Sequence, residues 1–463
     1  MILMELNDKR VLVVGLGKSG VASALFLKSR GARVTVSDSK PEAELRDEIL
    51  LLLEHGITVE TGGHGDRTFR GQDLIVVSPG VPVDAPQLVQ ARKQGEPVVV
   101  IGEIELAAQF LAGSIAAITG ANGKTTTTSL AGEIIAAGKF STLVGGNIGT
   151  PAISLVDRAG PATWTVLEVS SFQLETIVEF RPRIAVILNI TPDHLDRHKT
   201  FANYVNAKAR VFENQRQDDF TVLNADDPTT AGLSDRTRAQ LFWFSRKKEI
   251  EKGAFVRGTH IYFRDGHSEC GIMPLADVPL KGAHNLENAL AGVSVGMLAG
   301  CQPEQIRQAV RNFKAVEHRL EFVARVADVD YYNDSKATNV DATIKALEAF
   351  PADIPPHLHL ILGGKDKGSD YTVLNELLRQ RVKRVYTIGA AAAKIESQIQ
   401  GAVEIEHAET LENAVRRANE SAVPGDVVLL APACASFDQF QNYEHRGRLF
   451  KETVHSLAMS RST

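Results

Sequence analysis

The chain has 463 residues, of which 44% are hydrophobic and 23% charged, and its formal net charge is -5. At about 150 residues per domain, this length predicts three domains, each able to bury its own core. The net charge argues against a general basic surface for nucleic acid, and no apolar run approaches the ~18 residues that a membrane span needs. The N-terminus does not resemble a signal peptide. We therefore expect a soluble, multidomain enzyme of the cytoplasm without a nucleic-acid partner.

Short β-branched runs recur along the chain, each ending in a glycine or polar turn. The runs are residues 10–14, 33–37, 74–77, 114–119, 164–169, 184–189, 220–224, 357–362, 384–388 and 426–430. Alternation of such runs with amphipathic stretches predicts parallel strands with crossover helices, and therefore an α/β fold. We place domain boundaries near Gly102 and Val316, where the pattern restarts, which gives domains of residues 1–102, 103–315 and 316–463.

The three cysteines carry no sign of a functional site. Cys270, Cys301 and Cys434 are far apart and fit neither a disulfide framework nor the spacing of a zinc site. We expect ordinary buried thiols in a reducing compartment.

The strongest local motif is Ile118-Thr-Gly-Ala-Asn-Gly-Lys-Thr-Thr126, between a predicted strand and a segment that we expect to be helical to about residue 137. Glycines allow backbone N–H groups to close around phosphates, and the helix N-terminus adds a positive dipole. Lys124 could then reach the terminal phosphates, and the Thr125 hydroxyl could bind magnesium. The strict Walker pattern requires glycine at the position of Ile118, so the plain alternative is a glycine-rich turn with a surface lysine.

Two further strand ends carry polar side chains that suit a metal ion. Glu168 ends the predicted strand 164–169, which is the usual position of an acid that holds nucleotide-bound magnesium. After strand 184–189, His194 and His198 have a spacing that suggests zinc on a helix. A third zinc ligand is not evident, and the neighbouring hydroxyl and carboxylate groups favour magnesium.

Near the start, Gly15-Leu-Gly-Lys-Ser-Gly20 follows a predicted strand, and Asp38 ends the next strand. This is the fingerprint of dinucleotide binding, in which the acid binds ribose hydroxyls. A nicotinamide-dependent dehydrogenase is therefore one interpretation. The alternative is that the site binds UDP, which presents the same pyrophosphate and ribose groups, because a dehydrogenase needs no second phosphate loop at Gly120.

These motifs together resemble the Mur ligase family, and the resemblance runs through nearly the whole chain. Besides the phosphate loop, the matching segments are 145–149, 167–174, 193–194, 206–209, 284–288, 318–319, 333–339, 362–364 and 431–439. The loop departs from the family pattern at Ala121, where threonine is common. The resemblance implies a Rossmann-like domain for a UDP substrate, a central P-loop-type ATPase domain and a Rossmann-like C-terminal domain that binds the amino acid.

The resemblance also implies an ATP-dependent ligase with two magnesium ions. Its catalytic residues would be Lys124, Glu168, His194 and Lys208, and its metal ligands Thr125, Glu168, His194 and a carbamylated Lys208. The ATP-binding residues would be Gly120, Ala121, Asn122, Gly123, Lys124, Thr125, Thr126, Asn285, Asn288, Arg319 and Asp334. Without the resemblance, Lys208 is typical of a solvated helical lysine. Asn285, Asn288, Arg319 and Asp334 would each be typical of a cap, a turn or a surface ion pair.

Within the family, the resemblance favours UDP-N-acetylmuramoyl-L-alanine and D-glutamate as substrates. The residues for the UDP substrate would be Lys18, Ser19, Asp38, Ser39, Gly80 and Asn147. Those for D-glutamate would be Thr338, Lys367, Ser436, Phe437 and Tyr443, although the neighbouring Lys365 is an alternative carboxylate partner. A sister ligase or a folylpolyglutamate synthase that uses another amino acid remains an alternative. We also expect a monomer whose C-terminal domain closes over ATP during turnover.

Overall fold

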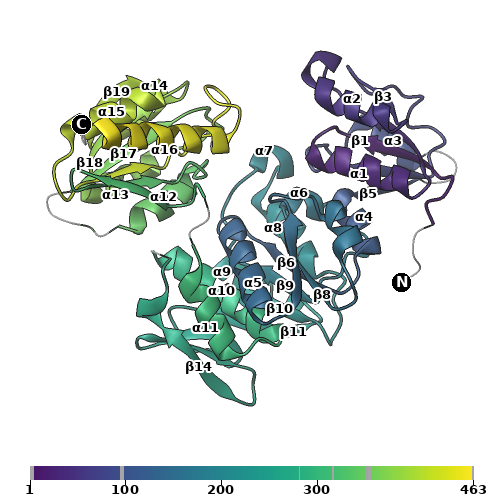
Figure 1. The fold of residues 1–463 in the computed structure, drawn as a ribbon, viewed down its shortest axis with the longest axis horizontal. Helices are drawn as coiled ribbons and strands as arrows, with labels where there is room; N and C mark the ends of the chain where they lie inside the picture. Colours follow the sequence, from purple (N-terminus) through teal and green to yellow (C-terminus); the bar gives the residue numbers. More distant parts are fainter. Residues whose placement is uncertain are drawn as a thin grey trace. The chain divides into compact units, whose positions relative to one another are not determined.

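The computed structural model describes residues 5–93, 98–280, 282–314, 317–350, 352 and 356–460. They form three β-sheets with helices packed against each (Figure 1). The chain divides into two compact units, residues 1–279 with 287–313, and residues 280–286 with 314–463. The first unit holds the first two sheets and the second unit the third. The predicted boundary at Val316 lies outside the described residues.

The N-terminal sheet is fully parallel, in the order β3-β2-β1-β4-β5. Its strands are β1 (Arg10–Val14), β2 (Arg33–Ser37), β3 (Thr58–Glu60), β4 (Leu74–Val77) and β5 (Val99–Gly102), and its helices are α1 (Lys18–Ser29), α2 (Arg46–Glu54) and α3 (Pro86–Lys93). Val11 and Val13 pack in the cluster that contains α1 and α2, whereas Leu12 and Val14 pack against α3. This two-sided burial explains why the strands are continuous apolar runs.

The central sheet has nine strands in the order β14-β13-β12-β11-β10-β9-β6-β8-β7. They are β6 (Ser114–Thr119), β7 (Ser141–Gly146), β8 (Thr163–Glu168), β9 (Ile184–Ile187), β10 (Phe220–Asn224), β11 (Gln240–Ser245), β12 (Gly253–Arg257), β13 (His260–Arg264) and β14 (Glu269–Pro274). The helices of this region are α4 (Glu103–Phe110), α5 (Lys124–Ala137), α6 (Ser171–Leu174), α7 (Leu195–His198), α8 (Phe201–Ala209), α9 (Pro228–Ala231), α10 (Ala283–Leu298) and α11 (Pro303–Asn312), with 3-10 helices η2 (Ala152–Arg158) and η3 (Arg210–Phe212). Strand β6 therefore lies between β8 and β9, parallel to both.

The third sheet has the order β15-β16-β20-β17-β18-β19. Its strands are β15 (Glu321–Val326), β16 (Val329–Asn333), β17 (Leu358–Gly363), β18 (Val382–Ile388), β19 (Glu404–Glu409) and β20 (Val427–Leu430), and its helices are α12 (Val340–Glu348), α13 (Asn375–Arg381), α14 (Ala392–Ile399), α15 (Leu411–Ser421) and α16 (Tyr443–Ser460). One cluster packs α12, α13 and α14 on one face, and another packs α15 and α16 on the other. Only β15 is antiparallel to its neighbour.

The predicted α/β class and all ten predicted strands are confirmed, with end shifts of one or two residues. Strand β9, for example, ends at Ile187 rather than at residue 189. The other strands were not predicted, and they are β3, β5, β7, β11, β12, β15, β16 and β19 together with the antiparallel strands β13 and β14 at one edge of the central sheet. The expectation of three buried thiols is wrong for Cys270, which is half-buried on edge strand β14, whereas Cys301 and Cys434 are buried. None of the helices in the described residues is long and apolar enough to span a membrane.

Candidate active site

The phosphate-loop motif connects β6 to α5 through two glycines in conformations that other residues rarely adopt. Gly120 has φ of +154°, and Gly123, the residue before α5, has φ of +84°. A Cβ at Gly123 would lie 2.2 Å from Oδ1 of Asn288. The loop therefore requires glycine here, and it directs the chain into the N-terminus of a 14-residue helix, where N–H groups attract anions. The plain glycine-rich turn is thus the less favoured interpretation.

Asn189, two residues after the neighbouring strand β9, braces the phosphate loop. Its carbonyl accepts a hydrogen bond from Ala121 N (2.8 Å). Its side chain accepts from Asn122 N (2.9 Å) and donates to Asn122 O (3.1 Å). The sequence analysis gave Asn189 no role. The available signal was a polar residue directly after a strand that pairs with the phosphate-loop strand.

Two lysines converge on one carbonyl of the loop. The Nζ atoms of Lys124 and Lys208 donate to Gly120 O at 2.9 and 2.7 Å, and Lys124 also donates to Ala121 O at 2.8 Å. Lys208 is only 1% exposed. Its burial, and then the charge of Lys124, hold the pKa of the Lys208 amine well below its usual value. The structure therefore brings the two predicted lysines together, and burial disfavours the charged form of Lys208.

The interpretation of Lys208 as a solvated helical lysine is wrong. Tyr204 and Phe212 lie four residues before and after it, and both are buried with it. Its ammonium group lies 4.7 Å from the centre of the Tyr204 ring. The signal in the sequence was this spacing, because residues four apart share a helix face and two of the three are aromatic.

Glu168 joins two other predicted residues at the end of β8. Its carboxylate is buried and accepts hydrogen bonds from the Thr125 hydroxyl (2.8 Å) and from the side-chain amide of Asn147 (2.8 Å). The backbone N of Asn147 also donates to Glu168 O (2.9 Å). The Thr125 hydroxyl, in the first turn of α5, and the Glu168 carboxylate, at the end of β8, are oxygen donors of the kind that Mg²⁺ prefers. A residue predicted for the UDP substrate thus contacts a residue predicted for the metal.

His194 is held in a left-handed backbone conformation that residues other than glycine rarely adopt. It precedes α7 with φ of +53°, and its side chain is 40% exposed. Its ring lies 4.9 Å from that of Phe172 and its Nε2 lies 3.6 Å from the Asp193 carboxylate. A strained, half-exposed imidazole is consistent with a functional role.

His198 does not support the zinc alternative. Its Nε2 lies 3.0 Å from the Ser171 hydroxyl, and its Nδ1 lies 3.3 Å from the Glu175 carboxylate. Burial lowers the pKa of the His198 ring. Both ring nitrogens are engaged within the protein, and within the described residues no group of three His, Cys, Asp or Glu side chains is arranged to hold a metal ion.

The remaining predicted ATP residues belong to two regions. Asn288 lies against the loop, because its Oδ1 accepts from Thr127 Oγ1 at 3.2 Å, and Asn285 lies one turn earlier on α10. Asn285 and Asn288 are both buried. In the second unit, burial raises the pKa of Asp334 to about 6, and the charge of Arg319 opposes this shift. Asp334 and Arg319 are therefore electrostatic neighbours rather than a surface ion pair.

The Gly15 fingerprint forms a tight loop that Asp38 fastens. A Cβ at Gly20 would lie 1.8 Å from Gly15 O. The Asp38 carboxylate is buried and accepts from Leu16 N (2.6 Å) and Lys40 N (2.8 Å). Asp38 thus stabilises the conformation of the glycine loop, in addition to any contact with ribose. The other predicted positions follow strands at the same sheet edge or begin α1, and they are Lys18, Ser19, Ser39 and Gly80.

In the second unit, hydrogen bonds join two segments predicted to bind the amino acid. Tyr443 begins α16, and its hydroxyl accepts from Lys336 Nζ (2.8 Å) while its carbonyl accepts from Ser335 Oγ (2.8 Å). Thr338 lies in the same turn, where its N donates to Lys336 O (2.8 Å). Lys336 was not predicted, although its motif was recognised.

The loop that carries Lys365 and Lys367 is hydrogen-bonded to the segment that contains Ala435 and Ser436. Lys365 and Ala435 form a two-way backbone bridge, with N to O distances of 2.8 and 3.1 Å. Ser436 is buried, whereas Phe437 is 68% exposed. Lys365 and Lys367 are both exposed, so the geometry leaves both as candidates.

Arg446 is a fully buried brace that the sequence analysis missed. Its guanidinium donates to Ser335 Oγ (3.0 Å), Ser335 O (2.7 Å) and Cys434 O (3.1 Å). Burial lowers its pKa to about 10. It thereby connects the 335–338 turn with the 434–437 segment. An arginine in an amphipathic helix gives no sign of such burial, because arginine is mostly a surface residue.

Comparison with known proteins matches three successive parts of the chain to domains of one family. The family models that match are "Mur ligase MurD-like, N-terminal domain" over residues 9–100, "Mur ligase middle domain" over 118–296 and "Mur ligase, glutamate ligase domain" over 318–434. UDP-N-acetylmuramoylalanine–D-glutamate ligase of Koribacter versatilis is 68% identical, covering 98% of this chain and 99% of the relative. The same enzyme of Acidobacterium capsulatum is 60% identical, covering 97% of each chain.

Solved structures share the fold at low identity. A UDP-N-acetylmuramate–alanine ligase from Thermotoga maritima superimposes with a TM-score of 0.60 at 20% identity, covering 97% of this chain and 100% of that one. A pseudomurein peptide ligase type C from Methanothermus fervidus gives 0.61 at 18%, with the same coverage.

Fold, phosphate loop and matches together define an ATP-dependent ligase of acids and amino acids. The chain belongs to the Mur ligase family. The N-terminal match includes the Gly15 fingerprint, so the dehydrogenase interpretation is wrong.

Replacement of Asn189 by alanine tests the brace on the phosphate loop. Two hydrogen bonds to Asn122 are lost, each worth about 0.5–1.5 kcal/mol. We expect the KM for ATP to rise about tenfold while the melting temperature changes little. Asn214→Ala is the matched control, because its side chain donates to Val178 O and Phe180 O away from the loop. Equal KM values in both variants would contradict the role of Asn189.

Proposed function

We propose that the chain joins D-glutamate to UDP-N-acetylmuramoyl-L-alanine with hydrolysis of ATP to ADP and phosphate, as a step in peptidoglycan precursor synthesis. The observation that carries this proposal is the 68% identity, over 98% of the chain, to a ligase named for that reaction. We further propose domains of residues 1–102, 103–315 and 316–463, which the matched ranges support. A cytoplasmic monomer is the proposed working form.

In the proposed reaction the substrate carboxylate attacks the γ-phosphorus of ATP, and ADP leaves. The resulting acyl phosphate is attacked by the amine of D-glutamate, which loses a proton, and phosphate leaves to give the amide. Lys124 has the reach and charge to stabilise the transferring phosphoryl group, and the loop N–H groups would orient the phosphates. Positioning and charge neutralisation therefore supply most of the catalysis.

Magnesium fits the donor set at the end of β8. The Thr125 hydroxyl and Glu168 carboxylate are 2.8 Å apart and offer only oxygen atoms. These two residues would hold one ion, which neutralises phosphate charge when bound. The Asn147 amide, which donates to the other Glu168 oxygen, would fix the orientation of the carboxylate.

A second ion requires a change at Lys208. While its Nζ donates to Gly120 O, Lys208 offers no oxygen atom to a magnesium ion, which prefers oxygen ligands. Its lowered pKa favours the neutral amine, which can add CO₂ and release a proton to form a carbamate. The neutral amine beside Lys124 would then become an anion, and with His194 it would hold the second magnesium ion.

For D-glutamate we propose Thr338, Ser436, Phe437 and Tyr443 with either Lys367 or Lys365 as the carboxylate partner. The hydrogen bonds among the 335–338 turn, the Lys365 bridge and the start of α16 support a shared site. For the UDP substrate we propose Asp38 and the positions at its sheet edge, together with Asn147. Asp38 would act there through the glycine loop as well as through ribose.

Phosphate release from ATP distinguishes the proposed reaction from its alternatives. With magnesium and UDP-N-acetylmuramoyl-L-alanine present, we expect turnover with D-glutamate and none with L-glutamate, L-alanine, L-lysine or meso-diaminopimelate. Turnover with another of these amines would assign the chain to a sister ligase. Turnover only with a folate acceptor would assign it to a folylpolyglutamate synthase.

Carbamylation of Lys208 predicts dependence on dissolved CO₂. We expect enzyme equilibrated with ¹³CO₂ to show a carbamate carbon signal that Lys208→Gln lacks and Lys199→Gln, at an exposed lysine, retains. Lys208→Gln should also lower kcat by about 100-fold or more, because a charged group at the phosphoryl site is lost. An active wild-type enzyme without the signal, or a fully active Lys208→Gln variant, would refute the carbamate.

A further inference from the structure

Helix α4, which connects the first two sheets, carries two buried carboxylates. Glu103 and Glu105 are each only 1% exposed, which is rare for glutamate. Glu105 is fully compensated, because it accepts from the backbone N of Val178 (2.8 Å), Glu179 (3.0 Å) and Phe180 (2.8 Å). Its function is therefore to fasten α4 to the turn before β9.

Glu103 is not compensated in this way. Its Oε1 accepts from Ile153 N at 2.7 Å, whereas its Oε2 is a buried atom without a hydrogen-bond partner in the described part of the chain. Burial raises the pKa of Glu103 to about 7, although Ile153, Ala152 and Gln173 oppose this shift. A half-satisfied buried carboxylate costs stability, so the stability of the fold gives no reason for it.

The first segment that Glu103 holds is the end of the Asn147 loop. Ile153 lies at the start of η2, directly after residues 147–151. Gly146 N donates to Thr150 O (2.9 Å), which closes the loop, and Asn147 N donates to Glu168 O. The hydrogen bond from Ile153 therefore fixes one end of the segment that carries Asn147.

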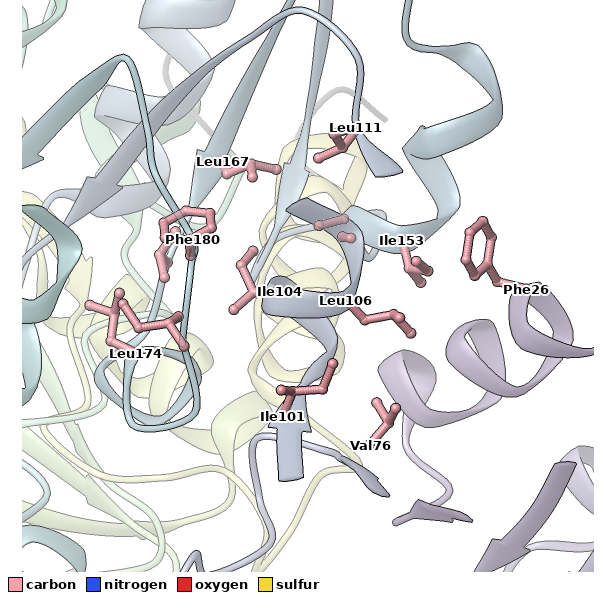
Figure 2. Close-up of a cluster of buried hydrophobic side chains, with 14 of the residues drawn as sticks. Phe26, Val76, Ile101, Ile104, Leu106, Leu111, Ile153, Leu167, Leu174 and Phe180 are labelled. Carbon is pink, nitrogen blue, oxygen red and sulfur yellow. The ribbon is translucent and has the colours of Figure 1, made fainter. Parts of the chain in front are cut away.

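The second segment follows Glu168. The Gln173 side chain lies close enough to stabilise the charged form of Glu103. Its Oε1 accepts from Ser170 N (2.9 Å) and from Ser170 Oγ (3.0 Å), which caps α6 two residues after Glu168. Ile104, next to Glu103, belongs to the same buried cluster as Ile153 and Leu174, so both segments pack around the start of α4 (Figure 2).

We infer that Glu103 is a positioning residue that keeps the Asn147 loop and the end of β8 in the register that the Asn147–Glu168 hydrogen bond requires. We assign Glu103 no contact with substrate or metal, because its side chain is buried among protein groups. It acts through Ile153 on one side and through Gln173 on the other. The inference rests on the roles proposed above for Asn147 and Glu168.

The test compares Glu103→Gln with Glu105→Gln, its matched control on the same helix. An amide at residue 103 keeps the shape but weakens the acceptor for Ile153 and presents N–H groups toward Gln173. We expect the KM for UDP-N-acetylmuramoyl-L-alanine and the magnesium concentration for half-maximal rate to rise by about 10- to 100-fold, with the KM for D-glutamate unchanged. Glu105→Gln should lower the melting temperature at least as much as Glu103→Gln does, and it should leave these kinetic constants unchanged.

Calorimetric binding of the UDP substrate separates this inference from the proposed function. Weaker binding in Glu103→Gln, but not in Glu105→Gln, supports positioning even if D-glutamate proves to be the wrong amine. Identical kinetic constants and binding in the two variants would overturn it, because Glu103 would then be only structural. If Glu103→Gln does not fold, Glu103→Asp decides in the same way, since its shorter side chain keeps the charge but not the reach to Ile153.

Discussion

The carbonyl oxygen of Gly120 accepts hydrogen bonds from the Nζ atoms of two lysines, and the rest of the candidate active site is arranged around that pair. Lys124 comes from the loop itself and Lys208 from α8, 88 residues away. Burial, and then the charge of Lys124, disfavour the charged form of Lys208 and hold its pKa well below the usual value. The arrangement therefore suits both an anion that neutralises Lys124 and the proposed addition of CO₂ to a neutral Lys208 amine.

Sheet order makes this arrangement possible. Because β6 lies between β8 and β9, one neighbour brings Glu168 to the phosphate loop and the other brings Asn189. The Glu168 carboxylate thus places negative charge beside Thr125, and the neutral Asn189 side chain supports the phosphate loop at Asn122. The linker helix α4 then fastens the segments behind Glu168, through one fully compensated and one poorly compensated carboxylate. If the inferred role of Glu103 holds, the geometry at the reacting atoms depends partly on residues of this linker helix.

The sequence alone predicted what short-range patterns control. The predicted strands of the first and third sheets are largely apolar, whereas β3, β15 and β19 carry exposed polar residues and were not predicted. The glycines at 120 and 123 indicate a phosphate turn because few other residues adopt their backbone conformations. Burial of Lys208 and Arg446 could not be predicted in this way. Each depends on elements far along the chain, and a charged residue in a helix is ordinarily solvated. The hydrogen bond that Leu16 N donates to the Asp38 carboxylate was missed for a different reason. The fingerprint assigns such an acid to ribose, so no structural role was considered for it.

Isotope transfer from the substrate carboxylate tests the central claim most directly, namely that this site activates a carboxylate as an acyl phosphate. The acid substrate would be prepared with ¹⁸O in its terminal carboxylate and turned over with ATP and D-glutamate. When the acyl phosphate reacts with the amine, the departing phosphate retains the carboxylate oxygen that attacked the γ-phosphorus. Each phosphate released should therefore carry one ¹⁸O atom from the substrate. Phosphate released without label, while the amide forms, would show that the carboxylate never attacks ATP and would contradict the account.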